Sequence, residues 1–323
     1  MSTHVYQVTV TGADAHLDTP LTNIAIKAFQ GAEDFIGLRV LPPVPVAKES
    51  DKYYTIDLGA WLGIPNTRRS RKSAPNRVEW KISSDAYFCD NYALAGENAL
   101  EDLANADAAL RLRDNTTQFV TEALLRDLEV RVANLVTSIS NLGSGVVLSG
   151  ANLWSNYTSS DPVADVTTGH AFIRQRTGLS ANTLVLDMDT LQIVRRHPLL
   201  LDMYKYTQGG MLDEATLKSV FQVENLFIGK GIKNNAIEGQ ANSITNIWGN
   251  NAILARVVPG VSLQTATFGL AFQWTPEGLP GPMAVERYED ADRGKKVEVV
   301  AAGYWQDEKV VARDLAYAIT TTL

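Results

Sequence analysis

The chain has 323 residues, of which 45 % are hydrophobic and 20 % are charged, a composition typical of a globular protein with an apolar core. Its formal net charge of −7 argues against a protein that wraps its surface around nucleic-acid phosphates, and its single cysteine, Cys89, excludes an internal disulfide. The length predicts two lobes, and without a run of 18 apolar residues or a signal-peptide pattern we expect neither a membrane span nor secretion.

The N-terminal residues predict a polar tail followed by an extended arm. Residues 1–20 are polar and show little periodicity. From Leu21 onward apolar residues recur without forming a long element, and Pro42, Pro43 and Pro45 hold the following backbone extended. Such a segment is typical of an arm that lies across another surface.

Residues 51–88 predict a long two-stranded loop. Strand-like runs cover residues 52–57 and 78–88, and glycines, prolines and basic residues separate them. An isolated pair of strands is only marginally stable in water. We therefore expect this loop to rest on another surface.

A long helix is predicted over residues 115–141, after an acidic, helix-permissive stretch at 90–110. Apolar residues recur along it at steps of three and four, so they share one face. The opposite face is expected to carry Glu122, Arg126 and Glu129. Asn115 and Gln118 resemble a capping box at its start, and Gly143 and Gly145 are expected to end it. At about 1.5 Å per residue the helix is roughly 40 Å long and can serve as a spine for other elements.

The second half of the chain alternates between helical and strand patterns, which predicts a compact α/β lobe. A strand pair around a turn near Asp292 follows, and we expect a final strand pair over residues 303–322. The expected elements before these pairs are helices at 171–177, 188–198, 199–206 and from Asp213, and strands at 183–187, 225–231 and 246–258.

No catalytic or ligand-binding motif is present. The chain has no GxSxG, HExxH, CxxC or phosphate-loop spacing, and its four histidines are far apart in sequence. Cys89 is expected to be a half-buried strand thiol. We therefore expect no catalytic residues, no cofactor and no metal ion.

The order of these elements resembles the major capsid proteins of tailed bacteriophages, which have the Hong Kong 97-type fold. The resemblance is carried by residues 21–54, 84–94, 105–130, 182–198 and 205–210. It implies an α+β fold with four parts. These are an N-terminal arm (1–45), an extended loop (46–85), a peripheral domain on the long spine helix (86–165 plus 283–323) and an axial α/β domain (166–282), with the C-terminal strands assigned to either of the last two.

The same resemblance implies a structural function. Copies of the chain would assemble as pentamers and hexamers into an icosahedral shell around the double-stranded DNA of a phage. Implied partners are a portal, a cementing protein and a scaffolding protein, which we expect to be a separate chain because only 20 residues precede Leu21. Two alternatives are an encapsulin-like compartment that holds protein cargo and, in a different class, a soluble two-lobed α/β enzyme.

Charge is segregated around the extended loop, and this predicts a contact between subunits. We expect the loop tip to dock on the acidic stretch of the next subunit, with each exposed pair contributing about 0 to 1 kcal/mol. Contact with packaged DNA and a solvated loop without a specific role are the alternatives. The basic residues are Arg68, Arg69, Arg71, Lys72, Arg77 and Lys81; the acidic ones are Asp85, Asp90, Glu97, Glu101, Asp102 and Asp107; and the expected aromatic anchors are Tyr53, Tyr54, Trp61 and Trp80.

Overall fold

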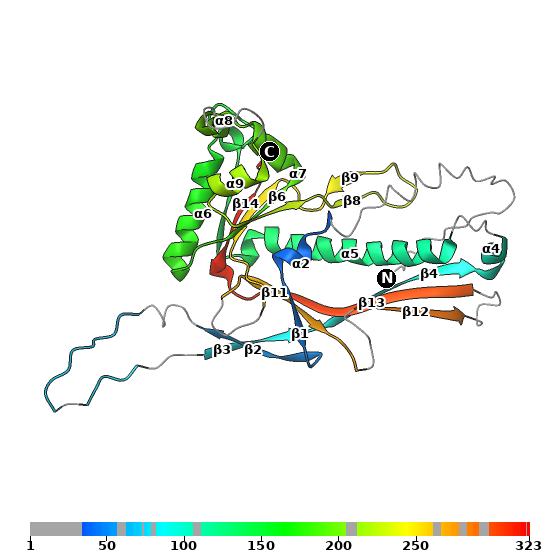
Figure 1. Ribbon diagram of the computed structural model, residues 1–323, viewed down its shortest axis with the longest axis horizontal. Helices are drawn as coiled ribbons and strands as arrows, with labels where there is room; N and C mark the ends of the chain where they lie inside the picture. Colours follow the sequence, from blue (N-terminus) through cyan, green and yellow to red (C-terminus); the bar gives the residue numbers. More distant parts are fainter. Residues whose placement is uncertain are drawn as a thin grey trace.

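The long helix α5 (Leu112–Thr137) lies between two sheets in the computed structural model (Figure 1). One sheet lies along the length of this helix, and an α/β lobe sits over its C-terminal half. The structure describes residues 34–56, 63–72, 74–78, 82–105, 111–204, 212–260, 266–277, 283–290, 297–320 and 322–323.

The first sheet is built on the 14-residue strand β13. Its strands are mostly antiparallel, and β4 pairs along one side of β13, from Asp90 opposite Gln306 to Ala99 opposite Val297. The other strands follow the hydrogen-bonded path β1, β11, β13 and β12, in which β11 and β12 pair with different parts of β13. The strands are β1 (Pro43–Val46), β4 (Asp90–Ala99), β11 (Gly269–Trp274), β12 (Met283–Asp290) and β13 (Val297–Val310).

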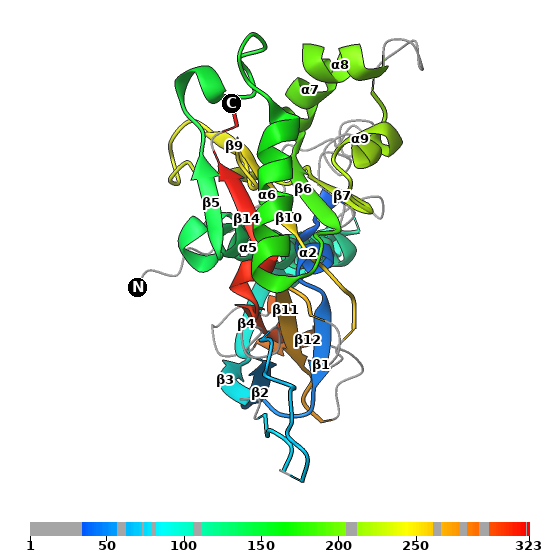
Figure 2. The same ribbon diagram turned by 90° about the vertical axis from the view of Figure 1, so that its left-hand side faces the viewer.

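The second sheet has the order β5, β14, β10, β6 and β7. Its central strands are almost wholly buried, and α6 lies across one face (Figure 2). Its strands are β5 (Ser144–Val147), β6 (Thr183–Asp187), β7 (Asn225–Gly229), β10 (Asn251–Ala255) and β14 (Ala316–Thr320), and its helices are α6 (Pro162–Thr177), α7 (Met188–Arg196), α8 (Pro198–Tyr204) and α9 (Glu214–Val220).

Shorter elements complete the described chain. Among them, β2 pairs with β3 and β8 pairs with β9, and each pair forms a separate two-stranded sheet. No helix in the described ranges is both long enough and apolar enough to cross a membrane. The remaining elements are α2 (Gly37–Val40), β2 (Ser50–Ile56), β3 (Ile82–Phe88), α4 (Leu100–Asn105), β8 (Ile232–Asn234), β9 (Ile244–Asn246) and 3-10 turns at Ile139–Asn141, Gly150–Asn152 and Arg313–Leu315.

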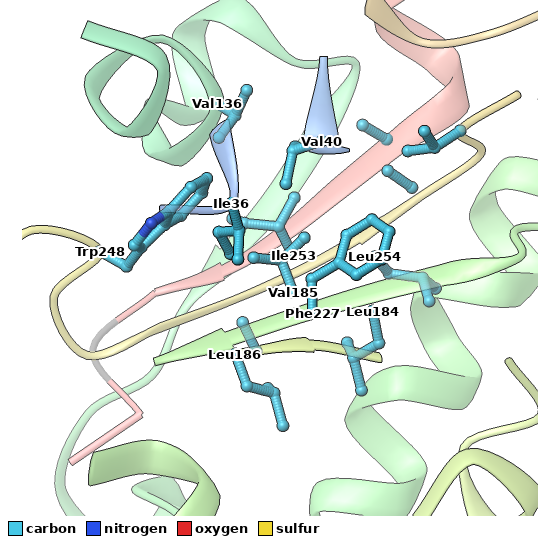
Figure 3. Close-up of a cluster of buried hydrophobic side chains, with 14 of the residues drawn as sticks. Ile36, Val40, Val136, Leu184, Val185, Leu186, Phe227, Trp248, Ile253 and Leu254 are labelled. Atoms are coloured by element: carbon cyan, nitrogen blue, oxygen red, sulfur yellow. The ribbon is translucent and has the colours of Figure 1, made fainter. Parts of the chain in front are cut away.

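The main core lies where α2 and α5 meet the second sheet. Figure 3 shows Ile36, Val40 and Val136 gathered over the strands that carry Val185 and Ile253. All five side chains are almost completely buried. Apolar burial of this kind contributes roughly 1.5 to 3 kcal/mol per side chain, so it is what joins the spine helix to the lobe.

A buried carboxylate joins three parts of the fold. Glu129 of α5 accepts hydrogen bonds from the backbone N–H groups of Ile36 (2.9 Å) and Gly37 (2.6 Å) and from Nε1 of Trp248 (2.5 Å). Its side chain is fully buried, and this burial raises the pKa of the carboxyl group. Because Trp248 belongs to the lobe, the single carboxylate connects the end of the arm, the spine helix and the lobe.

The predicted long helix is confirmed, but the predictions of its exposed face and of its two ends are wrong. The expected apolar stripe is buried, including Val120, Leu128 and Val132. Glu122 and Glu129, which were expected on an exposed face, are buried as well, because elements pack on more than one side of this helix. The predicted capping box and glycine stop are wrong, since the helix begins after Arg111 without a side-chain cap and ends before Ser138.

Two further predictions of secondary structure and strand pairing are wrong, because the pairing depends on strands that are distant in sequence. Residues 90–99 form β4 rather than a helix, since β13 offers them a full ladder of hydrogen bonds. The final strands β13 and β14 do not pair with each other, because the turn at Arg313–Leu315 sends them into different sheets. The sheets do not follow the order of the chain: β5 and β14 pair in the second sheet, the placement allowed above for a C-terminal strand, and β11 pairs in the first.

Candidate inter-subunit surface

The hairpin of β2 and β3 is fixed at its root by a second apolar cluster. The rings of Tyr53 and Tyr87 lie against Phe272 of β11, with centroids 5.3 and 4.7 Å apart. Tyr53 also donates its hydroxyl hydrogen to Asp85 Oδ2 at 2.9 Å. Tyr53 is therefore held against β3 and β11 of its own chain.

Cys89 belongs to this root cluster. Its side chain is fully buried, which is deeper than the half-buried position expected, and its Sγ–H points to the carbonyl oxygen of Phe272 at 3.5 Å. Burial raises the pKa of the thiol to about 11. The thiol therefore stays protonated near neutral pH and acts as a small apolar group.

Two charged residues of β13 fix the direction in which the hairpin leaves the body. Asp307 Oδ2 accepts the backbone N–H of Phe88 at 2.9 Å, and Lys309 Nζ donates to the carbonyl oxygen of Ala86 at 2.6 Å. Burial raises the pKa of Asp307. Both contacts join residues more than 200 positions apart, so local sequence patterns gave no sign of them.

The tip of the loop is exposed and basic. Every described residue between 63 and 78 is exposed, and Lys72 turns the chain with a positive φ of 66°. Asn66 shapes the tip, because its side chain accepts Arg68 N and its carbonyl accepts Asn76 Nδ2. The basic residues at this tip form no ion pair with another residue that the structure describes: Arg68, Arg69, Arg71, Lys72 and Arg77.

Of the acidic residues that the structure describes, Asp90 and Glu97 lie on β4, Glu101 and Asp102 lie on α4, and Asp85 lies on β3. On β4 the neighbours of Glu97 face the spine helix, since Asn98 Oδ1 accepts the Thr116 hydroxyl at 2.7 Å. Side chains alternate along a strand, so Glu97 is on the opposite, exposed face. Glu101 and Asp102 occupy the first turn of α4. Trp61, Trp80, Lys81 and Asp107 lie outside the described residues.

The two charged regions are at opposite ends of the molecule. Figure 1 shows the basic loop at one end of the longest axis and α4 at the other. A single chain therefore cannot bring Arg68–Lys72 to Glu101 and Asp102. A contact between these two regions would need a second copy of the chain.

The platform that carries the acidic strand is braced by arginines of the spine helix. Arg131 Nη2 donates to Glu308 Oε1 at 2.9 Å and to the Tyr304 hydroxyl at 3.1 Å, and its guanidinium lies over the ring of Tyr92, 3.6 Å from the centroid. Arg113 makes a bidentate contact with Glu298. These contacts link α5 to β4 and β13, so the acidic face is presented on a rigid support.

The described residues contain no candidate metal site. No three histidine, cysteine, aspartate or glutamate side chains within them come together in a geometry that would hold a metal ion. A hollow of about 620 Å³ lies between α2 and α5 and is lined mainly by apolar side chains such as Phe35, Leu125 and Leu128.

Comparison with known proteins identifies the kind of shell-forming protein. The major capsid protein of Pseudomonas phage JBD67 is 31 % identical over 263 residues, which cover 80 % of this chain and 83 % of that protein. A phage-related protein from Bordetella bronchiseptica has a similar solved structure, with a TM-score of 0.68, 22 % identity and coverage of 96 % and 98 % of the two chains. A chain of the bacteriophage PhiM1 mature capsid gives a TM-score of 0.56 with 9 % identity, over 87 % of this chain and 85 % of that one. No family model matches the sequence.

These similarities establish the fold and the family of the chain. The fold is the Hong Kong 97-type capsid fold, an α+β fold, as the similarity to a mature phage capsid shows. The chain belongs to the major capsid proteins of tailed bacteriophages. It is accordingly a structural protein of the capsid, which sets aside the two-lobed enzyme and favours a phage head over an encapsulin-like compartment.

Proposed function

We propose that copies of this chain assemble as pentamers and hexamers into a closed icosahedral shell that encloses the double-stranded DNA of a tailed phage. The observation that supports this most directly is the projecting hairpin. Its root is fixed by Phe272, Asp307 and Lys309, whereas its basic tip contacts no acidic partner among the described residues. A hairpin held in this way is suited to reach a neighbouring copy.

The proposed contact pairs the basic tip of one copy with the acidic β4 and α4 of the next. The tip contributes Arg68, Arg69, Arg71, Lys72 and Arg77. The acidic side contributes Glu97, Glu101 and Asp102, with Asp107 and the aromatic residues Trp61 and Trp80 as further candidates. Each exposed pair contributes about 0 to 1 kcal/mol, so the charges set register and orientation while repetition around a shell supplies stability.

The domain organisation that we propose follows the two sheets. The arm (1–45) and the extended loop (46–85) keep their limits. The peripheral domain contains the spine helix and the sheet of β4, β11, β12 and β13, and the axial domain contains the sheet of β5, β6, β7, β10 and β14. Other partners in this proposal are a portal, a separate scaffolding protein and a cementing protein, with DNA enclosed without sequence-specific contacts.

Charge reversal at the tip tests the proposed contact. The triple variant Arg68→Glu, Arg69→Glu and Arg71→Glu should prevent assembly into uniform shells, because like charges would then face each other. A second variant that also carries Glu97→Lys and Glu101→Lys should restore part of the assembly. Negative-stain electron microscopy and size-exclusion chromatography measure both results.

The control is Lys52→Glu, which changes an exposed charge on the same hairpin near its root and should leave assembly intact. DNA retention is measured in parallel by protection from nuclease. Normal shells that lose only their DNA would show that the tip contacts packaged DNA and would refute docking between subunits. Normal shells that keep their DNA would show that the tip has no specific role.

A further inference from the structure

His197 is buried at the corner between α7 and α8, at the end of the lobe where the loop before α6 also lies (Figure 2). Its backbone carbonyl accepts the N–H groups of Leu200 and Leu201, both at 3.1 Å, and so starts α8. Its ring meets the edge of Tyr157, with centroids 5.5 Å apart and planes at 86°. The side chain therefore contacts the loop of residues 148–161, while its backbone belongs to the α7–α8 corner.

Hydrogen bonding fixes the tautomer of this ring. Ser160 Oγ is 2.7 Å from the carbonyl oxygen of Asn156, which can only accept, so the hydroxyl donates its one hydrogen there. The same oxygen is 3.0 Å from His197 Nε2 and must accept from it. Nε2 therefore carries the hydrogen and Nδ1 carries none. Nδ1 is buried and has no hydrogen-bond partner in the described part of the chain.

A second proton on this ring would have to go to Nδ1, where a buried positive charge would have no acceptor. Asp161, which precedes α6, attracts a proton to the His197 ring and so opposes the effect of burial on its pKa. However, its Oδ1 already accepts hydrogen bonds from the N–H groups of Val163 and Ala164. Asp165 is bonded to Trp154, and at the helical corner Arg195 pairs with Glu214. Burial prevails over the attraction of Asp161, and the pKa of His197 is lowered.

We propose that His197 is an acid-sensitive latch, which holds the loop of residues 148–161 against the α7–α8 corner while its ring is neutral and releases that loop when the ring is protonated. The latch lies beside an exposed apolar surface. The exposed apolar side chains near it are Tyr157 of the loop and Leu199, Leu201 and Met203 of α8, all at least 38 % exposed. Acid would therefore change the shape of the most apolar part of this end of the lobe.

Hydrogen exchange of the full-length chain tests the latch. Amide exchange is measured by mass spectrometry at pH 7.5 and 5.5, with correction for the pH dependence of the chemical exchange rate. A free histidine has a pKa of about 6.5, so the opening equilibrium of the loop should rise up to about tenfold between these pH values. Peptides that cover residues 148–161 and 198–204 should show this rise.

The variant His197→Gln separates the latch from general acid sensitivity. Its amide can replace the Nε2–H donor but does not titrate, so the tenfold rise should disappear. The matched control is His170→Gln, which alters a histidine bonded to the carbonyl of Phe221 and should retain the rise. A rise in His197→Gln equal to that of the unmodified chain, or no rise in the unmodified chain, would overturn the proposal.

A measurement on the unmodified chain keeps the proposal testable if His197→Gln does not fold. Nitrogen NMR of the histidine rings reports the tautomer and the titration of each ring. The latch requires a neutral His197 with hydrogen on Nε2 that resists protonation well below pH 6.5. A hydrogen on Nδ1, or titration near pH 6.5, would refute it.

Discussion

Glu129→Ala would remove the common acceptor of three buried donors, which come from the end of the arm and from the lobe. An orphaned buried donor costs about 1 to 3 kcal/mol, so the three together cost about 3 to 9 kcal/mol. Removal of the carboxylate also relieves its own desolvation, which has already raised the pKa of Glu129. The expected net loss in the free energy of unfolding is therefore about 3 to 5 kcal/mol.

Urea unfolding, followed by circular dichroism and tryptophan fluorescence, measures this loss. Asn134→Ala is the matched control, since Asn134 is exposed on the same helix and its loss should change stability by less than about 0.5 kcal/mol. Glu129→Gln keeps one acceptor oxygen, so its free energy of unfolding should lie between those of Glu129→Ala and Asn134→Ala. The reasoning would be refuted if Glu129→Ala and Asn134→Ala differed by less than about 1 kcal/mol.

Two further substitutions test the hairpin root and the packing of the lobe. Phe272→Ala removes the ring that Tyr53 and Tyr87 contact, which should cost about 3 to 5 kcal/mol of packing energy. Because the root of the hairpin is then less firmly held, trypsin should cleave within residues 63–78 faster than in the unmodified chain. Unchanged cleavage relative to Tyr54→Ala, at a position 66 % exposed, would contradict this role. Gly229→Ala would place a methyl group against the indole of Trp248 and should destabilise the chain by about 1 to 3 kcal/mol in thermal unfolding, whereas unchanged stability would show that the ring can move aside.

The parts of the fold that local patterns predicted are those with strong local causes. The apolar stripe of α5 follows from helical spacing, and the helix after Asp213 begins where its side chain accepts Thr216 N. The strand at 183–187 is a short apolar run and is wholly buried. In each case the residues that decide the structure are neighbours in sequence.

The predictions that were wrong concern residues whose structure depends on contacts with residues far away in the sequence. Asp90–Ala99 reads as helix-permissive by itself, yet it pairs with a strand that begins about 200 residues later. Glu129 resembles a solvated residue of an amphipathic helix until Ile36 and Trp248 supply its donors. No local pattern distinguishes such a residue from an exposed glutamate.

For the candidate surface as well, the sequence predicted the local features but not those that depend on distant residues. Composition alone located the basic and acidic stretches, because charge is visible in the sequence. The support of the hairpin was not visible, since Phe272, Asp307 and Lys309 reach it from the other end of the chain. The direction of the hairpin, which places its tip far from α4 of the same chain, depends on these contacts.

The most direct test of the account is electron microscopy of the purified full-length chain at moderate salt, beside size-exclusion chromatography. A capsid protein with this projecting hairpin should form closed shells of uniform diameter or rings of five and six copies. A stable, homogeneous monomer at every salt and protein concentration tried, with or without a scaffolding protein, would contradict assembly into a shell.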